Sequence, residues 1–158
     1  MSNKTKFLSH AAIIAALYVV LTFIASAFAL SSGVIQIRFS EALTILPMFT
    51  PAAIPGLFIG CILSNMLSGC VFWDVIFGSL ATLIGAFGTR LLKKHKYLAM
   101  LPPILANTII VPFVLRFAYG ADGAIWYFMV TVGIGEILSC GVLGSFLHVA
   151  LEKIKHIF

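Results

Sequence analysis

The chain has 158 residues, of which 61% are hydrophobic and only 9% are charged, and its formal net charge is +5. A soluble domain has roughly a quarter of its residues charged, so this composition excludes an ordinary water-soluble protein. Most Lys and Arg residues gather near the N-terminus, at 93–96 and near the C-terminus, as orientation charges do beside membrane spans. We therefore expect a polytopic, all-α integral membrane protein. We expect no nucleic-acid partner, because few basic residues remain for phosphate contacts.

The first membrane helix is expected at residues 7–30. A transmembrane helix needs about 20 mostly apolar residues, and this run supplies them. Lys4 and Lys6 precede the run as they would precede a signal peptide. However, the run is longer than the apolar region of a signal peptide, and further spans follow it. We expect a retained helix.

The next apolar stretch, 41–67, is interrupted by prolines that include Pro47 and Pro51. Proline removes a helix donor and clashes with the preceding turn, so one continuous helix is disfavoured. We expect two short helices instead, at 38–49 and 51–67. The first is too short to cross the bilayer alone at 1.5 Å per residue, so it must lean on the rest of the protein.

Three longer apolar runs follow, at 71–92, 97–119 and 124–151. Basic segments face the cytoplasm, so both tails and the cluster at 93–96 are expected there. An even number of spans must then separate the N-terminus from this cluster, which agrees with two short middle helices. The prediction is a six-helix bundle with cytoplasmic N- and C-termini and short second and third helices. It forms a single transmembrane domain over residues 1–158.

Polar side chains at membrane depth are costly, so each is a candidate for function. By this topology, most of them converge on the outer half of the bundle and suggest a pocket. The candidates for substrate binding are Gln36, Arg38, Glu41, Asn65, Trp73, Asp74, Asn107 and Glu136.

Several of these candidates have a structural alternative. Arg38 and Glu41 are three residues apart and would pair on one helix face. Trp73 fits an interfacial aromatic belt, and Asn65 and Asn107 fit hydrogen bonds between helices.

Other kinds of site have no counterpart in the sequence. There is no phosphate-binding loop of the GxxxxGK[ST] type and no nucleophile beside a base, so we expect no enzyme and no catalytic residues. The three cysteines have no metal-ligand spacing and are interpreted as small buried residues. No metal and no cofactor are implied.

The first helix carries alanines four residues apart at Ala11/Ala15 and Ala12/Ala16. Small residues at this spacing form a flat stripe where another helix approaches closely. The stripe serves either packing inside the bundle or contact with a partner protein.

Four segments resemble a known family: IQIRFSEALTILP at 35–47, TPAAIPGLFIGC at 50–61, DVIFGSLAT at 74–82 and LPPILAN at 101–107. They are similar to the queuosine-precursor transporter family, QueT, whose members are S components of energy-coupling factor (ECF) transporters. The resemblance covers almost the whole chain.

The resemblance implies a multi-pass subunit of the bacterial plasma membrane that captures 7-aminomethyl-7-deazaguanine or a close relative from outside. It also implies docking on an EcfT-like transmembrane coupling subunit that carries two cytoplasmic ATPase subunits. The alanine stripe matches the position where such families contact the coupling subunit. The carboxylates, amides and Trp73 named above have the chemistry to bind a deazaguanine base.

Three alternatives stay open at the level of the sequence. The chain is an S component for another vitamin, a stand-alone carrier in which Glu136 and Asp74 hold a coupling ion, or a membrane scaffold that transports nothing.

Overall fold

The computed structural model describes residues 2–30 and 35–154, and all regular structure in these ranges is helical. The elements in chain order are α1 (Asn3–Ala27), the 3-10 helix η1 (Phe39–Met48), α2 (Ala53–Leu67), α3 (Phe72–Leu91), η2 (Leu98–Met100), α4 (Leu101–Phe117), α5 (Ile125–Glu136), the π-helix η3 (Ile137–Leu143) and α6 (Gly144–Glu152). Since η2 leads directly into α4, and η3 joins α5 to α6, these elements make the six predicted helices. The predicted all-α fold is confirmed.

Four helices are long and apolar enough to cross a membrane: Asn3–Ala27, Phe72–Leu91, Leu98–Phe117 and Ile125–Glu152. The two shorter apolar helices are η1 and α2, as predicted. Large apolar side chains such as Leu8, Leu91 and Phe146 stand exposed on the outside of the bundle. Such a surface suits lipid rather than water, so the chain is a multi-pass membrane protein.

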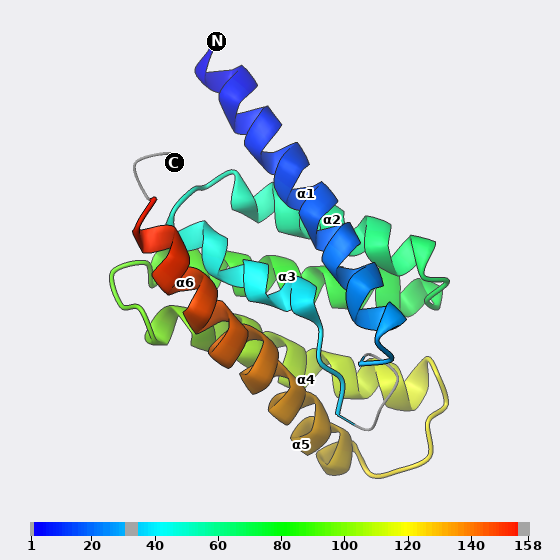
Figure 1. Cartoon of the computed structure of the whole chain (residues 1–158). Helices are drawn as coiled ribbons and strands as arrows, with labels where there is room; N and C mark the ends of the chain where they lie inside the picture. Colours follow the sequence, from blue (N-terminus) through cyan, green and yellow to red (C-terminus); the bar gives the residue numbers. More distant parts are fainter. Residues whose placement is uncertain (1, 31–34, 155–158) are drawn as a thin grey trace.

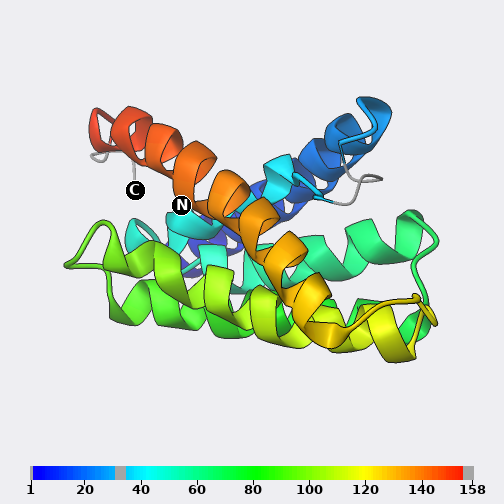
Figure 2. The same cartoon turned by 90° about the horizontal axis from the view of Figure 1, so that it is seen from below.

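The connections between helices are sorted to two ends of the bundle. The start of α1, the η1–α2 link, the loop after α3 and the end of α6 lie at one end (Figures 1 and 2). The α2–α3 and α4–α5 connections lie at the opposite end, with the end of α1. The basic cluster at 93–96 is therefore at the same end of the bundle as the start of α1 and the end of α6. The distribution of basic residues in the sequence predicts this arrangement. That this end faces the cytoplasm stays a prediction.

The short helix η1 lies inside the protein, and every residue from Ser40 to Pro47 is buried. It contacts α1, α3, η3 and α6 (Figure 1). The guanidinium of Arg90 donates from Nη1 to the carbonyl oxygens of Pro47 and Met48, at 3.0 and 3.3 Å. These bonds satisfy acceptors that a helix leaves free at its C-terminal end. The expectation that this segment leans on the rest of the protein is confirmed.

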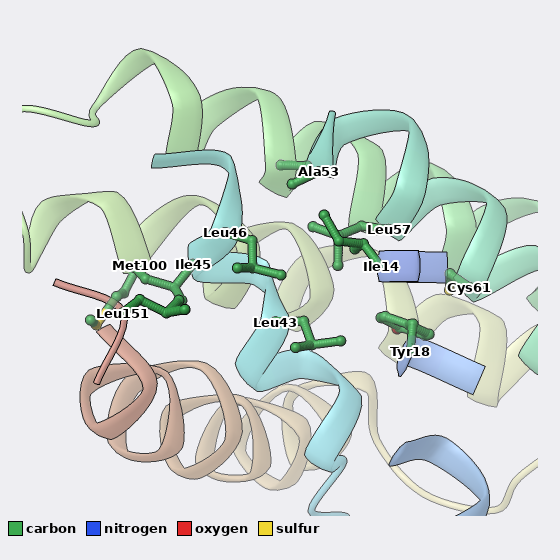
Figure 3. Packing of buried hydrophobic residues seen from close by; sticks show 11 residues of the cluster. Ile14, Tyr18, Leu43, Ile45, Leu46, Ala53, Leu57, Cys61, Met100 and Leu151 are labelled. Atoms are coloured by element: carbon green, nitrogen blue, oxygen red, sulfur yellow. The ribbon is translucent and has the colours of Figure 1, made fainter. Parts of the chain in front are cut away.

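The hydrophobic core is built around η1. Leu43, Ile45 and Leu46 of this helix pack with Ile14 of α1 and Leu57 of α2 (Figure 3). The cluster extends at its other end to Met100 and Leu151. In lipid, van der Waals packing rather than release from water holds helices together, and these contacts fix η1 and with it the polar residues at its start.

Helices α1 and α2 approach closely through small residues. A Cβ atom added to Gly60 would lie 2.7 Å from the Cβ atom of Tyr18 and 3.0 Å from the carbonyl oxygen of Ala15. Ala11 and Ala15 are buried, and both pack against α2 glycines. By contrast, Ala12 and Ala16 face outward and are exposed. The alanine stripe thus has one row used inside the bundle and one row free of these intramolecular contacts.

Candidate functional site

Two cavities lie inside the bundle, with volumes of about 360 and 210 Å³. Gln36, Arg38 and Leu115 line both of them, so these three residues form a common wall. Both cavities lie toward the end of the bundle where α2 joins α3 and α4 joins α5, because Asp74 lies in the first turn of α3 and Tyr127 in the first turn of α5. If the basic end is cytoplasmic, this end is the outer one.

Most residues that line the larger cavity have polar side chains. Among the described residues that line it, Asp74 is the one carboxylate, and it accepts a hydrogen bond from the Tyr119 phenol, with 2.7 Å between the oxygens. The Asn65 amide donates to the backbone carbonyl oxygen of Asp74 at 3.4 Å and joins α2 to α3. Burial, together with the Asp74 carboxylate, raises the pKa of Tyr119, so the phenol stays protonated and serves as a donor. Hydroxyl and thiol groups complete the wall: Tyr18, Thr22, Ser26, Ser40, Ser64, Ser68 and Cys70.

The smaller cavity combines one carboxylate with aromatic rings. Glu136 lines it together with the shared residues Gln36 and Arg38. Tyr127 and Phe128 add two rings, and the remaining lining residues are Val111, Thr131 and Val132. An apolar pocket with a few placed polar groups is the usual form of a small-molecule site.

A cluster of three buried groups adjoins this cavity: Glu41, Glu136 and Cys140. One ligand atom from each lies within 4.8 Å of the other two, and the carboxylates are only 2% and 8% exposed. The Cys140 thiol donates to Glu136 Oε2 at 3.2 Å, and the Tyr18 phenol donates to Glu41 Oε1. The Asn107 amide lies close to both carboxylates. Two carboxylates and a thiol have the chemistry to hold a cation.

One oxygen of this cluster lacks a partner. Among the residues that the structure describes, no donor reaches Glu41 Oε2 within hydrogen-bonding distance. A buried acceptor left without a hydrogen bond costs about 1–3 kcal/mol. A donor added at this atom would therefore stabilise the site.

The segment that carries Gln36 and Arg38 is pressed against helix α5. A Cβ atom on Gly135 would lie only 2.2 Å from the carbonyl oxygen of Gln36, so glycine is required for this approach. The backbone N–H of Arg38 donates to the Ser139 hydroxyl at 3.1 Å. These two contacts hold the common wall of the cavities in place.

The Arg38 guanidinium does not form the expected pair with Glu41. Across residues 2–30 and 35–154, no carboxylate lies within 4.0 Å of it, and its hydrogen bond runs from Nη2 to Gln36 Oε1 at 3.4 Å. Arg38 precedes η1 in extended backbone, so the helical spacing behind that expectation does not apply. Its charge still acts on Asp74, Glu41 and Glu136, which surround it.

The predicted site residues fall into three groups. Those that border the cavities are Gln36, Arg38, Asn65, Asp74 and Glu136. Glu41 and Asn107 are buried beside them. Trp73 lines neither cavity in the described part of the chain; the residue is 55% exposed and borders an apolar groove with Phe77 and Phe113.

Sequence reasoning did not single out Tyr18, Tyr119, Gly135, Ser139 or Cys140. Tyr18 lies in an apolar run and was counted only as part of a span. Cys140 was interpreted as a small apolar residue, although it follows Glu136 by four positions and so shares a helix face with it. That spacing was the one signal that could have found it.

An apolar helical bundle that encloses a charged, two-lobed site defines a polytopic membrane protein suited to binding a polar solute. Comparison with known proteins gives the family: residues 8–153 match the QueT transporter family. The chain belongs to this family, as the resemblance of its motifs indicated.

One relative is named queuosine precursor transporter QueT, from Lactococcus lactis subsp. cremoris (strain MG1363), and is 44% identical over 95 residues. The aligned region covers 60% of this chain and 56% of that protein. No solved structure matches the chain.

Proposed function

We propose that this chain is the substrate-binding S component of an ECF-type importer. It captures a queuosine precursor, 7-aminomethyl-7-deazaguanine, from outside and delivers it through an ATP-powered coupling module. The observation that carries the proposal is the charged, two-lobed site enclosed in the bundle of a QueT transporter family chain. The relative's name supplies the class of substrate.

The chemistry of the base supports this assignment. A deazaguanine presents ring N–H and amino donors, which carboxylates accept, and a carbonyl oxygen, which Arg38 or Gln36 can bind from the common wall. Its flat ring needs an aromatic neighbour. Tyr127 and Phe128 line the smaller cavity and fit this role better than Trp73, whose ring lies in a separate groove.

The exposed alanines support a partner on α1. Ala12 and Ala16 leave a flat strip on the lipid-facing side of the helix, where the backbone of another helix can approach. We assign this strip to a transmembrane coupling subunit of the EcfT type, which carries two cytoplasmic ATPase subunits. Ala11 and Ala15 contribute indirectly, because they position α1 against α2.

An uptake experiment tests the ATP-powered mechanism. Labelled 7-aminomethyl-7-deazaguanine is offered to cells that express the chain with or without the coupling subunit and ATPases. We expect uptake only with the complete module, loss of uptake in Glu136→Gln, and normal uptake in Glu152→Gln, an exposed site on α6. Uptake that persists without ATPases and collapses with a protonophore would replace the proposal with the ion-coupled carrier.

A further inference from the structure

The carboxyl groups Glu41 and Glu136 are buried side by side, with no cationic side chain of the described residues within 4.0 Å of either. Both are at least nine-tenths buried, and their acceptor atoms lie within 4.8 Å of each other and of Cys140 Sγ. Taking a carboxylate out of water costs several kcal/mol unless a counter-charge and hydrogen bonds compensate. Within the described ranges, no cationic side chain lies within 4.0 Å of either carboxylate. The ion pairs found there, Arg116–Asp122 and His148–Glu152, involve other residues.

The donors that the chain offers to this pair are neutral, and they include the Asn107 amide, which lies close to both carboxylates. Tyr18 occupies Glu41 Oε1, and the Cys140 thiol, a weak donor, occupies Glu136 Oε2. Glu41 Oε2 has no donor in the described part of the chain. The pair thus lacks a cation within 4.0 Å, and one oxygen of Glu41 lacks a hydrogen-bond donor.

A ligand can supply both from the smaller cavity. Glu136 lines that cavity, beside Thr131 and the aromatic rings of Tyr127 and Phe128. A primary ammonium brings one positive charge and three N–H donors. A ligand atom of Glu41 lies within 4.8 Å of one of Glu136, so these donors suffice for both carboxylates.

The Asp74 carboxylate, in the larger cavity, has different hydrogen-bond partners. It stands as a single carboxylate in its cavity and already accepts from the Tyr119 phenol at 2.7 Å. Asn65 and several hydroxyl groups surround it. This lobe suits the neutral donors and acceptors of a ring edge rather than a cation.

We infer that Glu41 and Glu136 form an ammonium subsite that recognises the aminomethyl arm of the ligand, while the Asp74 lobe meets uncharged ring edges. The inference rests on the proposed function and makes the arm the feature by which the protein selects its substrate. A free monovalent cation such as sodium has related chemistry. The ligand's own ammonium is favoured because the adjoining cavity, of about 210 Å³ with two aromatic rings, has the form of an organic-ligand site.

The test compares two bases that differ only in the amine. Binding of 7-aminomethyl-7-deazaguanine and of its uncharged 7-methyl analogue is measured by calorimetry with the purified chain in detergent. We expect the wild type to prefer the amine by at least about tenfold, or 1.4 kcal/mol. Glu136→Gln and Glu41→Gln should lose most of this preference through weaker binding of the amine. Asp74→Asn should weaken the binding of both bases to the same extent and keep the preference for the amine.

Each other result has a definite meaning. Equal wild-type affinity for the two bases, or an unchanged preference in Glu136→Gln, would overturn the ammonium subsite and leave the proposed function standing. Binding of neither base would remove the proposed function and the inference together. Tighter binding in sodium than in choline chloride, lost in Glu136→Gln, would assign the pair to a free ion. If Glu41→Gln does not fold, Glu136→Gln alone carries the comparison, because Glu136 borders open space.

Discussion

The Tyr18 phenol donates a hydrogen bond to the Glu41 carboxylate and so joins α1 to the buried helix η1. Tyr18 is 2% exposed and belongs to the same hydrophobic cluster as Leu43 of η1. One residue therefore contacts the core, the α1–α2 interface and the carboxylate pair. A movement of α1 against the bundle would therefore shift Tyr18 relative to the Glu41 carboxylate.

Replacing Tyr18 with Phe keeps the ring and removes the donor. A hydrogen bond to a charged group contributes about 1.5–3 kcal/mol, so we expect Tyr18→Phe to lower thermal stability in detergent by a comparable amount. Tyr97→Phe, which alters an exposed phenol, is the matched control and should unfold at the wild-type temperature. An unchanged unfolding temperature in Tyr18→Phe would show that the bond contributes nothing.

Adding one methyl group at Gly135 should disturb the common wall of the cavities. The new Cβ would overlap the carbonyl oxygen of Gln36 at 2.2 Å, so the segment with Gln36 and Arg38 must move. We expect Gly135→Ala to weaken base binding at least about tenfold, since displacements near 1 Å at a site have effects of this order. In Gly141→Ala the nearest atom is 3.8 Å away, and affinity should stay within about threefold. Equal affinities in the two variants would contradict the role given to this wall.

A substitution that overpacks the α1–α2 interface should lower the stability of the protein. In Gly60→Ala the added Cβ meets Tyr18 Cβ at 2.7 Å, and overpacking of this kind costs about 1–3 kcal/mol. Gly133→Ala meets only Thr108 at 3.4 Å and serves as the control. Thermal unfolding should rank Gly60→Ala clearly below both wild type and control, and the reverse order would contradict the packing described.

Substitutions in the two rows of the alanine stripe should have different effects: those in the exposed row should impair assembly with the coupling subunit, and those in the buried row should lower stability. Ala16→Leu fills the exposed row, so we expect ligand binding to stay within about twofold while co-purification of the coupling subunit is lost. Ala15→Leu enlarges the buried row and should lower stability instead. Ile13→Leu, also exposed on α1, should leave both unchanged. Normal assembly of Ala16→Leu would rule out this strip as the contact.

The helices could be predicted from the sequence because their signals are local. Apolar runs of membrane length are visible directly, Lys residues gather at both ends of the chain and at 93–96, and Pro47 and Pro51 mark the short middle helices. The helix types could not be predicted: η1 is a 3-10 helix and η3 is a π-helix. Their hydrogen-bond registers depend on packing between elements far apart in the chain, such as η1 against η3.

The site could be predicted only in part, because some of its residues have a local signal in the sequence and others do not. Asp74 and Glu136 were found because a carboxylate at membrane depth stands out in any apolar run. Trp73 was grouped with Asp74, yet neighbouring helical residues point about 100° apart, so Asp74 faces the cavity while Trp73 faces outward. Tyr18 and Cys140 resemble ordinary span residues, and only the folded structure brings their donors to the carboxylates.

The central claim is that this site binds a queuosine precursor. Calorimetry of 7-aminomethyl-7-deazaguanine with the purified chain, with guanine and riboflavin as comparison ligands, tests it most directly. We predict binding near one ligand per chain, no binding of riboflavin, and affinity at least about tenfold weaker in Glu136→Gln. A folded, monodisperse preparation that binds riboflavin instead, or none of the three, would contradict the claim.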